Sequence, residues 1–491
     1  MVSGLAALLC FGMGWAIVST GWTGGASPAE RMLKLFLSAG YGLGAFSTLF
    51  LVLRALGMVS VPAIDVLAFA VLLIGWRLSR RLVPGATVVP APGHDHPGWL
   101  RGSLTAGFGA ALAAALYCAV RRTIAYPNGE GWDVFAIWNL HARFLFRGGA
   151  GWREGFSALI PWSHPDYPLL LPGAIAHFWS DLGHETYVVP AIIGLVFTIS
   201  TAGVLFSALM LLRGRNVAML GGLALLATPS FIEQGTSQYA DIPLSFFILA
   251  TVVMLCQHDA SLALSAPWAG WIALAGLAAG FAAWTKNEGL LFLCSLLFAR
   301  FLMSAGGKRT GQAGETLAQP TSFTLLLLSA LPILLIILWF KRFIAPPGDL
   351  FVYAATTFHK FSDLARYRAI AKWFGKQFFR FGHWLWVPGS LLVAGISVAW
   401  RNWGAQPRGE DVAAGPRTGF RVCVVALTIT LCGYFVIYVI TPYDVYWHLR
   451  FSLNRLFLQL WPSAIFLCFV EFGVAGGQGG GEQGCLKMRC K

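Results

Sequence analysis

Acidic, basic and amide side chains gather in five short segments, 130–143, 164–168, 238–241, 286–288 and 444–455, which interrupt long apolar stretches of the chain. Carboxylates in such positions can act as general bases, while histidine, lysine and arginine can bind anionic groups such as phosphates. Ionisable side chains at the ends of apolar helices can also be anchors whose charged tips reach toward water. Five such segments with nearly uncharged stretches between them favour a functional site over a set of unrelated anchors.

Asp133 begins the first candidate helix, 133–147, which is predicted to be short, amphipathic and located at a membrane surface. Arg143 and Arg147 lie one turn apart near its end, and Gly148 occupies the position of a C-terminal capping glycine. The simplest interpretation gives Asp133 only the role of a helix cap. A catalytic or binding role is the alternative, and the company of the other polar segments favours it.

The other segments supply the remaining candidate side chains. Pro165 and Pro168 restrict the backbone of a His-Pro-Asp-Tyr-Pro turn and hold its histidine and aspartate at the entrance of the next apolar helix. That turn could be no more than a rigid connection, and Lys286 or Arg455 alone could be a membrane anchor. The candidate binding residues of all five segments are Glu130, Trp138, Asn139, Arg143, His164, Asp166, Tyr167, Gln238, Asp241, Lys286, Asn287, Glu288, Trp447, His448 and Arg450.

A second long polar segment, 341–384, contains a regular row of cations. Arg368, Lys372, Lys376 and Arg380 are four residues apart, which places them on one face of a predicted helix with aromatic residues beside them. Such a row can bind phosphate head groups. Contact with anionic lipids in general and contact with the phosphate of a specific substrate explain the row about equally well.

Three other polar features receive simpler interpretations. His94-Asp95-His96 lies in a loop rich in Pro and Gly, and its adjacent spacing is a weak metal signature, so we interpret it as solvated loop. Asp65 is the clear acid inside a predicted span, where an acid is either functional or hydrogen-bonded to a neighbouring helix. The 9 cysteines contain no CxxC pair, so the sequence predicts neither a disulfide framework nor a zinc site.

The composition identifies the environment in which these segments must be held. Of 491 residues, 57% are hydrophobic and 11% are charged, against roughly 25% charged in ordinary soluble domains. These values exclude a soluble globule, and the abundance of Phe and Trp excludes a disordered chain. The net charge of +14 does not indicate nucleic acid, because no basic domain is exposed to water. Anionic membrane lipids are the expected partners.

About thirteen apolar stretches are long enough to cross a bilayer as helices. The first begins close to Met1 without the positive segment of a signal peptide, so it is expected to remain as a span. The chain is therefore predicted to be an all-α polytopic membrane protein that also carries extracytoplasmic amphipathic helices. The predicted spans are 3–21, 32–55, 59–76, 103–120, 186–212, 216–229, 240–256, 267–284, 288–304, 322–340, 385–400, 420–440 and 456–473.

Alternation of these spans places the connecting segments on two faces that differ in chemistry. One face receives short connectors rich in lysine and arginine, including 77–81 and 213–215, and the Gly-rich C-terminal tail. Short basic connectors mark the cytoplasmic face, whereas long loops carry little orientation signal. The other face receives all five polar segments together with 341–384, so the candidate site is predicted to be extracytoplasmic.

Short motifs follow one another on that predicted extracytoplasmic face: Gly131-Trp132-Asp133, Ala136-Ile137-Trp138-Asn139, His164-Pro165-Asp166-Tyr167-Pro168, Gln238-Tyr239-Ala240-Asp241, Thr285-Lys286-Asn287-Glu288-Gly289 and Trp447-His448-Leu449. In this order they resemble bacterial membrane glycosyltransferases of the GT-C superfamily. These enzymes are relatives of the dolichyl-phosphate-mannose protein mannosyltransferases and of the aminoarabinose transferases that modify lipid A. The resemblance covers roughly 103–470. It divides the chain into additional N-terminal transmembrane helices (1–102), a GT-C-like catalytic region (103–473) and a cytoplasmic tail (474–491).

The resemblance implies transfer of a hexose or pentose from a polyprenyl-phosphate donor to a lipid, polysaccharide or protein acceptor, with inversion at the sugar. It implies that Asp133 is the catalytic base, because an acid in the first extracytoplasmic loop has that role in the superfamily. Relatives often carry two adjacent acids there, whereas Glu130 stands three residues away in this chain. This difference leaves open whether a divalent metal is bound.

The resemblance also distributes roles among the other candidates. Positive charge is needed where the lipid phosphate leaves, and the residues expected to supply it are Lys286, His448, Arg450 and the cations of the 368–380 row. The acids expected to hold sugar hydroxyls or to tune the base are Asp166, Asp241 and Glu288. The expected location is a bacterial plasma membrane with the active site on its outer side; the sugar, the acceptor and the oligomeric state stay open.

Two alternatives stay open, and the first belongs to a different class of protein. A transporter or flippase of a lipid-linked or anionic substrate would place ionisable groups near the middle of the membrane, whereas these groups lie at one rim, with Asp65 as the main exception. An enzyme similar to O-antigen ligases or polymerases would use the same lipid phosphate with another acceptor.

Overall fold

The computed structural model describes residues 2–22, 27–58, 62–82, 98–263, 269–306, 313–349, 358–383 and 417–475. Within these ranges every regular element is a helix, which confirms the predicted all-α fold. The predicted span 385–400, the His94-Asp95-His96 segment and residues 476–491 of the tail lie outside the described residues.

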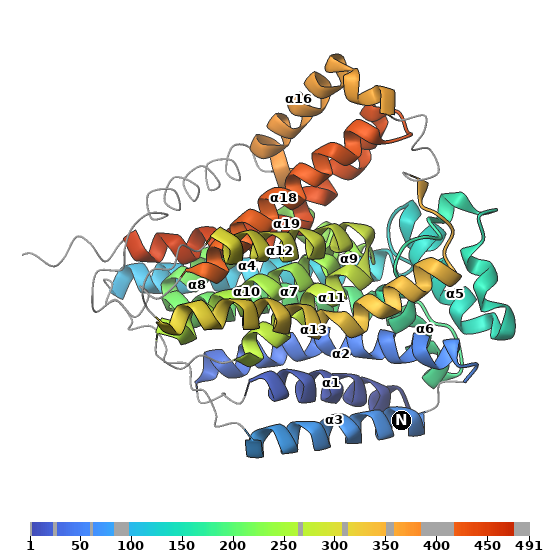
Figure 1. Cartoon of the computed structure of the whole chain (residues 1–491), viewed down its shortest axis with the longest axis horizontal. Coiled ribbons are helices and arrows are strands. Elements are labelled where there is room, and N and C mark those ends of the chain that lie inside the picture. Colours follow the sequence, from blue (N-terminus) through green and yellow to red (C-terminus); the bar gives the residue numbers. More distant parts are fainter. Residues whose placement is uncertain are drawn as a thin grey trace, which may run out of the picture.

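Long apolar helices form the body of the molecule (Figure 1). In the described part of the chain, 9 helices are long and apolar enough to cross a membrane, or up to 10 if a bent pair forms one span. The prediction of about thirteen spans is therefore not settled. The long helices are α1 (Val2–Gly21), α2 (Pro28–Ala55), α3 (Pro62–Leu82), α4 (Gly98–Ala125), α7 (Val188–Arg213), α10 (Asp241–Ala263), α11 (Ala269–Thr285), α12 (Asn287–Gly306), α13 (Ala313–Phe343), α18 (Thr418–Ile440) and α19 (Val445–Ala475).

The bent pair replaces the short span that was predicted at 216–229. It consists of α8 (Arg215–Leu226) and α9 (Pro229–Thr236), which meet at an angle of 66°. Pro229 begins the second helix, and a proline at a first helical position is tolerated because its missing N–H would have no partner there. The chain therefore turns at this point instead of continuing straight.

Helix α10 is the centre of the bundle. In its 22-residue span, 94% of the most apolar window is buried, and α7, α11, α18 and α19 pack around it. A helix that is apolar on all sides must be covered by other helices or by lipid, and α10 is covered by other helices. Because Asp241 is the first residue of this helix, the most buried element of the fold fixes the position of a candidate site residue.

The N-terminal helices pack against this bundle through small residues. A Cβ on Gly14 would clash with the backbone of α2, and a Cβ on Gly42 would clash with the backbone of α1, so both glycines allow close helix contact. Helix α2 also packs on α7, and α3 packs on the outer side of α1 (Figure 1). The proposed division into an N-terminal addition and a catalytic region stays a prediction.

The short elements lie at one end of the bundle and beside α18 and α19 (Figure 1). Between α4 and α7 are a π-helical turn η1 (Val134–Trp138), α5 (Asn139–Arg147), two 3-10 turns η2 (Gly149–Phe156) and η3 (Pro161–Ser163), and α6 (Leu170–Leu182). Between α13 and α18 the described elements are η4 (Phe358–Ser362), α16 (Leu364–Arg380) and η5 (Phe381–His383). These connections carry most of the predicted site residues.

Candidate functional site

Arg455 on α19 joins two of the predicted segments. Its guanidinium lies 2.8 Å from Asp133 Oδ2 and 2.9 Å from Asp241 Oδ2, and it covers the ring of Tyr239 at 4.5 Å from the centroid. Asp241 is fully buried, whereas the side chains of Asp133 and Arg455 are 23% and 16% exposed. The arginine therefore connects the protein interior to a carboxylate that solvent can reach.

Asp241 is the best-satisfied carboxylate of the site. It accepts hydrogen bonds from Arg455, from Lys286 Nζ at 3.1 Å and from Gln459 Nε2 at 2.6 Å. Tyr434 in turn donates its hydroxyl hydrogen to Gln459 Oε1 at 2.7 Å. Since a buried carboxylate without partners is costly, these donors explain how an acid can occupy the end of the most buried helix.

Lys286 carries a second pair of charges. Besides Asp241, it lies 2.8 Å from Glu288 Oε1. Burial alone lowers the pKa of Lys286, but the two carboxylates outweigh burial and raise it above its ordinary value. The ammonium group is therefore charged at neutral pH and fixed in place, which makes it a permanent positive charge inside the site.

Asp133 does not cap its helix, so that interpretation from the sequence is wrong. Its backbone is already helical and its side chain makes no capping hydrogen bond; the carboxylate instead pairs with Arg455. Gly131 makes this arrangement possible, because its φ of +97° suits glycine and a Cβ there would clash with the hydroxyl of Tyr239. At the other end of this segment Gly148 is right-handed, and Gly149 carries the positive φ.

Asp166 belongs to a neighbouring polar cluster. Asn287 donates to its Oδ2 at 2.7 Å, Lys341 lies 3.4 Å from the same oxygen, and Lys341 also donates to Asn287 Oδ1 at 2.8 Å. The His-Pro-Asp-Tyr-Pro turn is thus fastened to the start of α12 and the end of α13. Lys341 was treated only as part of a basic segment in the sequence, and its position at the end of an apolar span was the available signal.

Tyr167 stands between these two clusters. Its ring stacks on Trp138 and on His164, with centroid distances of 5.7 and 4.8 Å, and Lys286 Nζ lies 6.0 Å from its centroid. Burial, followed by the charge of Glu288, raises the pKa of Tyr167 well above its ordinary value. The hydroxyl therefore stays protonated and available as a hydrogen-bond donor.

Asn139 and Gln238 support the loop that carries Asp133. The amide of Asn139 donates to Gln238 Oε1 at 3.4 Å, and Gln238 donates to the carbonyl of Pro127 at 3.0 Å. Both side chains are buried, as is Trp138. These contacts support the loop, and the predicted role of the three residues in substrate binding stays a prediction.

Several predicted residues lie apart from the Asp133–Arg455–Asp241 centre. Glu130 pairs with Arg122, and Arg143 lies 3.5 Å from Glu185, which also binds Arg147. Glu130 and Arg143 are therefore paired with residues outside the central ion network, whereas Asp133 belongs to that network.

The final segment places its residues around the turn between α18 and α19. His448 forms a 2.9 Å hydrogen bond with the Thr441 hydroxyl and packs edge-on against Tyr438. Trp447 and Arg450 are exposed, and Arg450 covers the ring of Phe451. They are available to a ligand, but they do not contact the central carboxylates.

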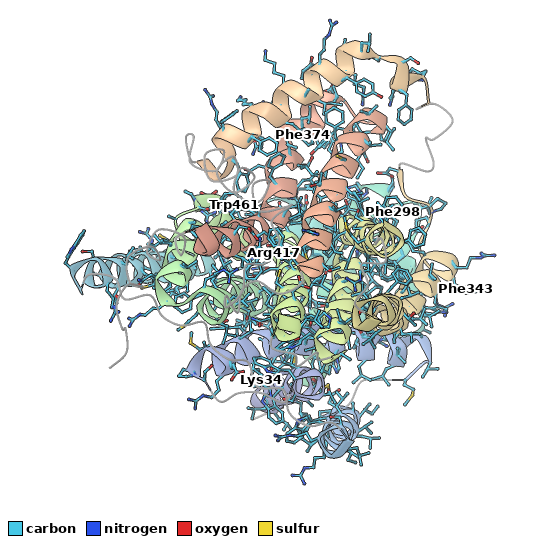
Figure 2. The ribbon with its side chains drawn as sticks, turned by 60° about the vertical axis from the view of Figure 1, so that its left-hand side comes forward. Lys34, Phe298, Phe343, Phe374, Arg417 and Trp461 are labelled. Carbon is cyan, nitrogen blue, oxygen red and sulfur yellow. The ribbon has the colours of Figure 1, made fainter. Side chains whose placement is uncertain are left out.

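The cationic row follows the exposed side of α16. Its four members Arg368, Lys372, Lys376 and Arg380 are all exposed, whereas Ile370 and Phe374 are buried on the opposite side. Phe374 packs on Phe435 of α18 and Phe457 of α19, and Figure 2 shows it between α16 and those helices. Apolar contact therefore orients the helix and turns its charged side outward.

Two further cations anchor this region to the turn between α18 and α19. Arg366 donates to the carbonyls of Tyr438 and Thr441, and Lys360 donates to the latter carbonyl at 2.8 Å. Asp363 accepts hydrogen bonds from two backbone N–H groups of the first turn of α16 and so caps the helix. The segment 358–380 is thereby fixed near His448.

The carboxylates of this site do not fit a divalent metal well. Asp133, Asp241 and Glu288 each face a lysine or arginine, and so do Glu130 and Asp166. A metal at these carboxylates would have to displace these cations.

Comparison with known families agrees with this geometry. The family model of the dolichyl-phosphate-mannose-protein mannosyltransferases matches residues 184–343, which include Asp241, Lys286, Glu288 and Lys341. The match spans less than half of the chain. It confirms the resemblance to GT-C mannosyltransferases and supports a glycosyltransferase of the GT-C type that uses a polyprenyl-phosphate sugar donor. No curated protein and no solved structure matches the chain.

The family match and the apolar helices together identify an integral, multi-pass membrane protein. The family match also supports a glycosyltransferase with a polyprenyl-phosphate sugar donor. The roles of individual residues, the acceptor and the membrane face of the site stay predictions.

Proposed function

We propose that the protein transfers a sugar from a polyprenyl phosphate to a hydroxyl group of a lipid, polysaccharide or protein acceptor at the outer face of a bacterial plasma membrane. The observation that carries this proposal is the ion network Asp133–Arg455–Asp241–Lys286, which joins four of the polar segments at one end of the bundle. Charged groups that are already fixed in place can stabilise the charge that develops in a transition state, because they do not have to reorient during the reaction.

Asp133 is the proposed catalytic base. In this step the acceptor oxygen forms a bond to the anomeric carbon, the bond from that carbon to the phosphate oxygen breaks, and the acceptor proton passes to the Asp133 carboxylate. One displacement of this kind inverts the configuration of the sugar. Arg455 supports the role because the ion pair fixes the position of the Asp133 carboxylate, which is 23% exposed.

The leaving phosphate requires positive charge that the carboxylates do not already neutralise. Among the described residues, exposed cations are offered by Arg450, near the start of α19, and by the row on α16, a helix that packs on α18 and α19 through Phe374. We propose that this row receives the phosphate of the donor lipid, while the Asp133 region receives the acceptor. Asp166 and Glu288 are proposed to bind sugar hydroxyls, with their lysine partners setting their orientation.

Donor competition in proteoliposomes tests the proposed function. Purified protein is given polyprenyl-phosphate mannose, a polyprenyl-diphosphate sugar or a nucleotide sugar, and the products are identified by mass spectrometry and by NMR of the anomeric proton. Transfer from the monophosphate with inverted configuration is expected. Transfer from the nucleotide sugar alone would overturn the proposal, as would retention of configuration.

The Glu154→Gln variant provides a matched control, because Glu154 is an exposed acid in the same segment as Asp133 and lies in η2. It is expected to transfer sugar at the parent rate. The alternative of a transporter receives no comparable support, since Asp241 and Lys286 lie at helix ends. Flux of a labelled lipid across the same proteoliposomes, without glycosyl transfer, would favour that alternative.

A further inference from the structure

A second buried cluster of ionisable side chains lies where α3, α2 and α6 meet. It consists of Asp65 in the first turn of α3 and of His177 and Asp181, which are four residues apart on α6 and therefore share a face. One ligand atom from each residue lies within 4.8 Å of the others. The residues are 0%, 0% and 8% exposed, so water does not solvate them.

The hydrogen bonding of His177 determines which of its nitrogens faces the acids. Its Nδ1 lies 2.9 Å from the carbonyl oxygen of Phe46, and a carbonyl only accepts, so Nδ1 carries a hydrogen. The ring is stacked on Phe46 at 3.6 Å and 9°, which fixes its orientation. In a neutral ring Nε2 then presents a lone pair to the carboxylates. Metal-binding histidines use the same arrangement, with the other nitrogen bonded to a carbonyl.

The cluster has too many acceptors for the donors around it. Nε2 of His177 lies 3.0 Å from Asp65 Oδ1, yet this nitrogen and all four carboxylate oxygens of Asp65 and Asp181 have no hydrogen-bond partner in the described part of the chain. A proton on Nε2 would serve one oxygen of one acid. The other carboxylate would still be buried without a donor, which is strongly unfavourable.

We propose that Asp65, His177 and Asp181 bind a divalent first-row metal ion such as Zn²⁺ or Mn²⁺. One imidazole nitrogen and two carboxylate oxygens are donors that such ions accept, and the two negative charges match the charge of the ion. Atoms that bind one ion at about 2.1 Å lie roughly 3.0–3.4 Å apart, which agrees with the separation of Nε2 and Oδ1.

The ion would link α3, an outer helix, to α6, which lies next to the site. Only 6% of the most apolar window of α3 is buried, and the main contacts of this helix within the bundle are with α1. Helix α6 follows the turn that carries Asp166. A metal between α3 and α6 would therefore fix the outermost helix and the element that positions this turn at the same time. The proposal does not depend on the proposed sugar transfer.

Metal analysis of the whole chain tests this inference. Protein is stripped with a chelator, dialysed against Zn²⁺ or Mn²⁺ alone, and analysed by inductively coupled plasma mass spectrometry. The background carries His94→Ala and His96→Ala, which removes a histidine pair that could bind metal elsewhere. We expect about one ion per chain, and at least a tenfold loss of affinity in Asp65→Asn and Asp181→Asn, because each removes a direct ligand.

Asp363→Asn is the matched control, because the same acid-to-amide change falls on an exposed helix cap that asparagine also provides. It is expected to keep the ion. Equal metal content in the parent and in Asp65→Asn would overturn the proposal. It would indicate that the buried acids are neutralised by protons that they share and not by a metal ion.

Thermal unfolding supplies a second readout that needs no variant. If the ion belongs to the folded protein, the chelator lowers the Tm of the parent and Zn²⁺ or Mn²⁺ restores it. The sign of the Asp181→Asn effect should reverse between conditions, since the variant removes repulsion when metal is absent and removes a ligand when metal is present. A parent Tm that responds to neither ion would contradict the inference.

Discussion

Two buried polar clusters lie at the same end of this bundle, and they differ in how their acids are neutralised. Around Asp241 the chain itself supplies Arg455, Lys286 and Gln459. Around Asp65 and Asp181 the chain supplies His177, whose Nε2 lies 3.0 Å from Asp65 Oδ1 and could donate to one carboxylate oxygen only. The charges of the first cluster are balanced once the chain has folded, whereas we propose that a bound metal ion balances those of the second.

The contrast gives each cluster a different use. A self-neutralised network keeps its geometry throughout a reaction, which suits the stabilisation of moving charge. A cluster with unpaired acceptors gains stability only when a cation binds, which suits a structural clip. Breaking the first cluster should therefore damage folding and catalysis, and changing the second should alter the response to metal.

Replacing Arg455 should have the largest effect on stability. Arg455→Met leaves the buried Asp241 short of a partner, which typically costs about 3–5 kcal/mol, and it releases Asp133. Thermal unfolding of the detergent-solubilised protein measures the loss. Arg450→Met, an exposed arginine on the same helix, should change the Tm little. If the two variants unfold at the same temperature, the network does not stabilise the fold as argued.

Gly131→Ala should cause the next largest loss of stability. The positive φ at this position should cost about 1–3 kcal/mol in the free energy of unfolding, and the new Cβ would also clash with the Tyr239 hydroxyl. Adding Tyr239→Phe should recover the part of the loss that is due to the clash. Gly149→Ala is the matched control, because Gly149 also has a positive φ but faces open space. Equal losses at the two glycines, measured by thermal unfolding, would show that the contact with Tyr239 is unimportant.

His141 predicts how stability depends on pH. Burial, followed by the charge of His164, lowers the pKa of His141 to about 3. Below the ordinary pKa of about 6.5 the unfolded chain binds a proton that the buried His141 of the folded protein does not. The free energy of unfolding is therefore expected to fall by about 1.4 kcal/mol for each pH unit below that value, and to be unaffected by this residue above it. His141→Leu should flatten the pH profile of the Tm between pH 6.5 and 4. The exposed His184, changed to Leu, should leave the slope unchanged.

The smallest expected effect comes from the row on α16. Each cation near a lipid phosphate contributes about 1 kcal/mol, so Lys372→Ala with Lys376→Ala should raise the KM for the polyprenyl-phosphate donor by roughly thirtyfold and leave kcat nearly constant. Arg153→Ala, at an exposed arginine of η2, is the control. An unchanged KM, with loss only of the dependence on anionic lipid in nanodiscs, would assign the row to general lipid contact.

The sequence predicted much of the fold because apolar helices are local features. The predicted spans 3–21 and 420–440 end within two residues of α1 and α18. The bend between α8 and α9 was missed because the apolar stretch continues across it, although Pro229 was the local signal. The π-helical turn before Asn139 was missed because tertiary contacts, and no local pattern, decide it.

The sequence predicted many of the residues of the site, but it did not predict which of them pair with one another. Acids and amides at the ends of apolar helices pointed to Asp133, Asp241 and Asn287. Arg455 looked like an anchor, because its partner Asp241 is far away in the sequence and nothing local reveals the pairing. For the same reason Asp65 gave no sign of the His177 and Asp181 that the fold brings to it.

Single-turnover kinetics of Asp133→Asn test the central claim most directly. With donor and acceptor both saturating, the account predicts that the variant binds the donor as the parent does and transfers sugar about 10²–10⁴-fold more slowly, because a general base contributes a factor of this size. Glu154→Gln should react at the parent rate. An Asp133→Asn protein that is folded and transfers sugar as fast as the parent would contradict the assignment of the base.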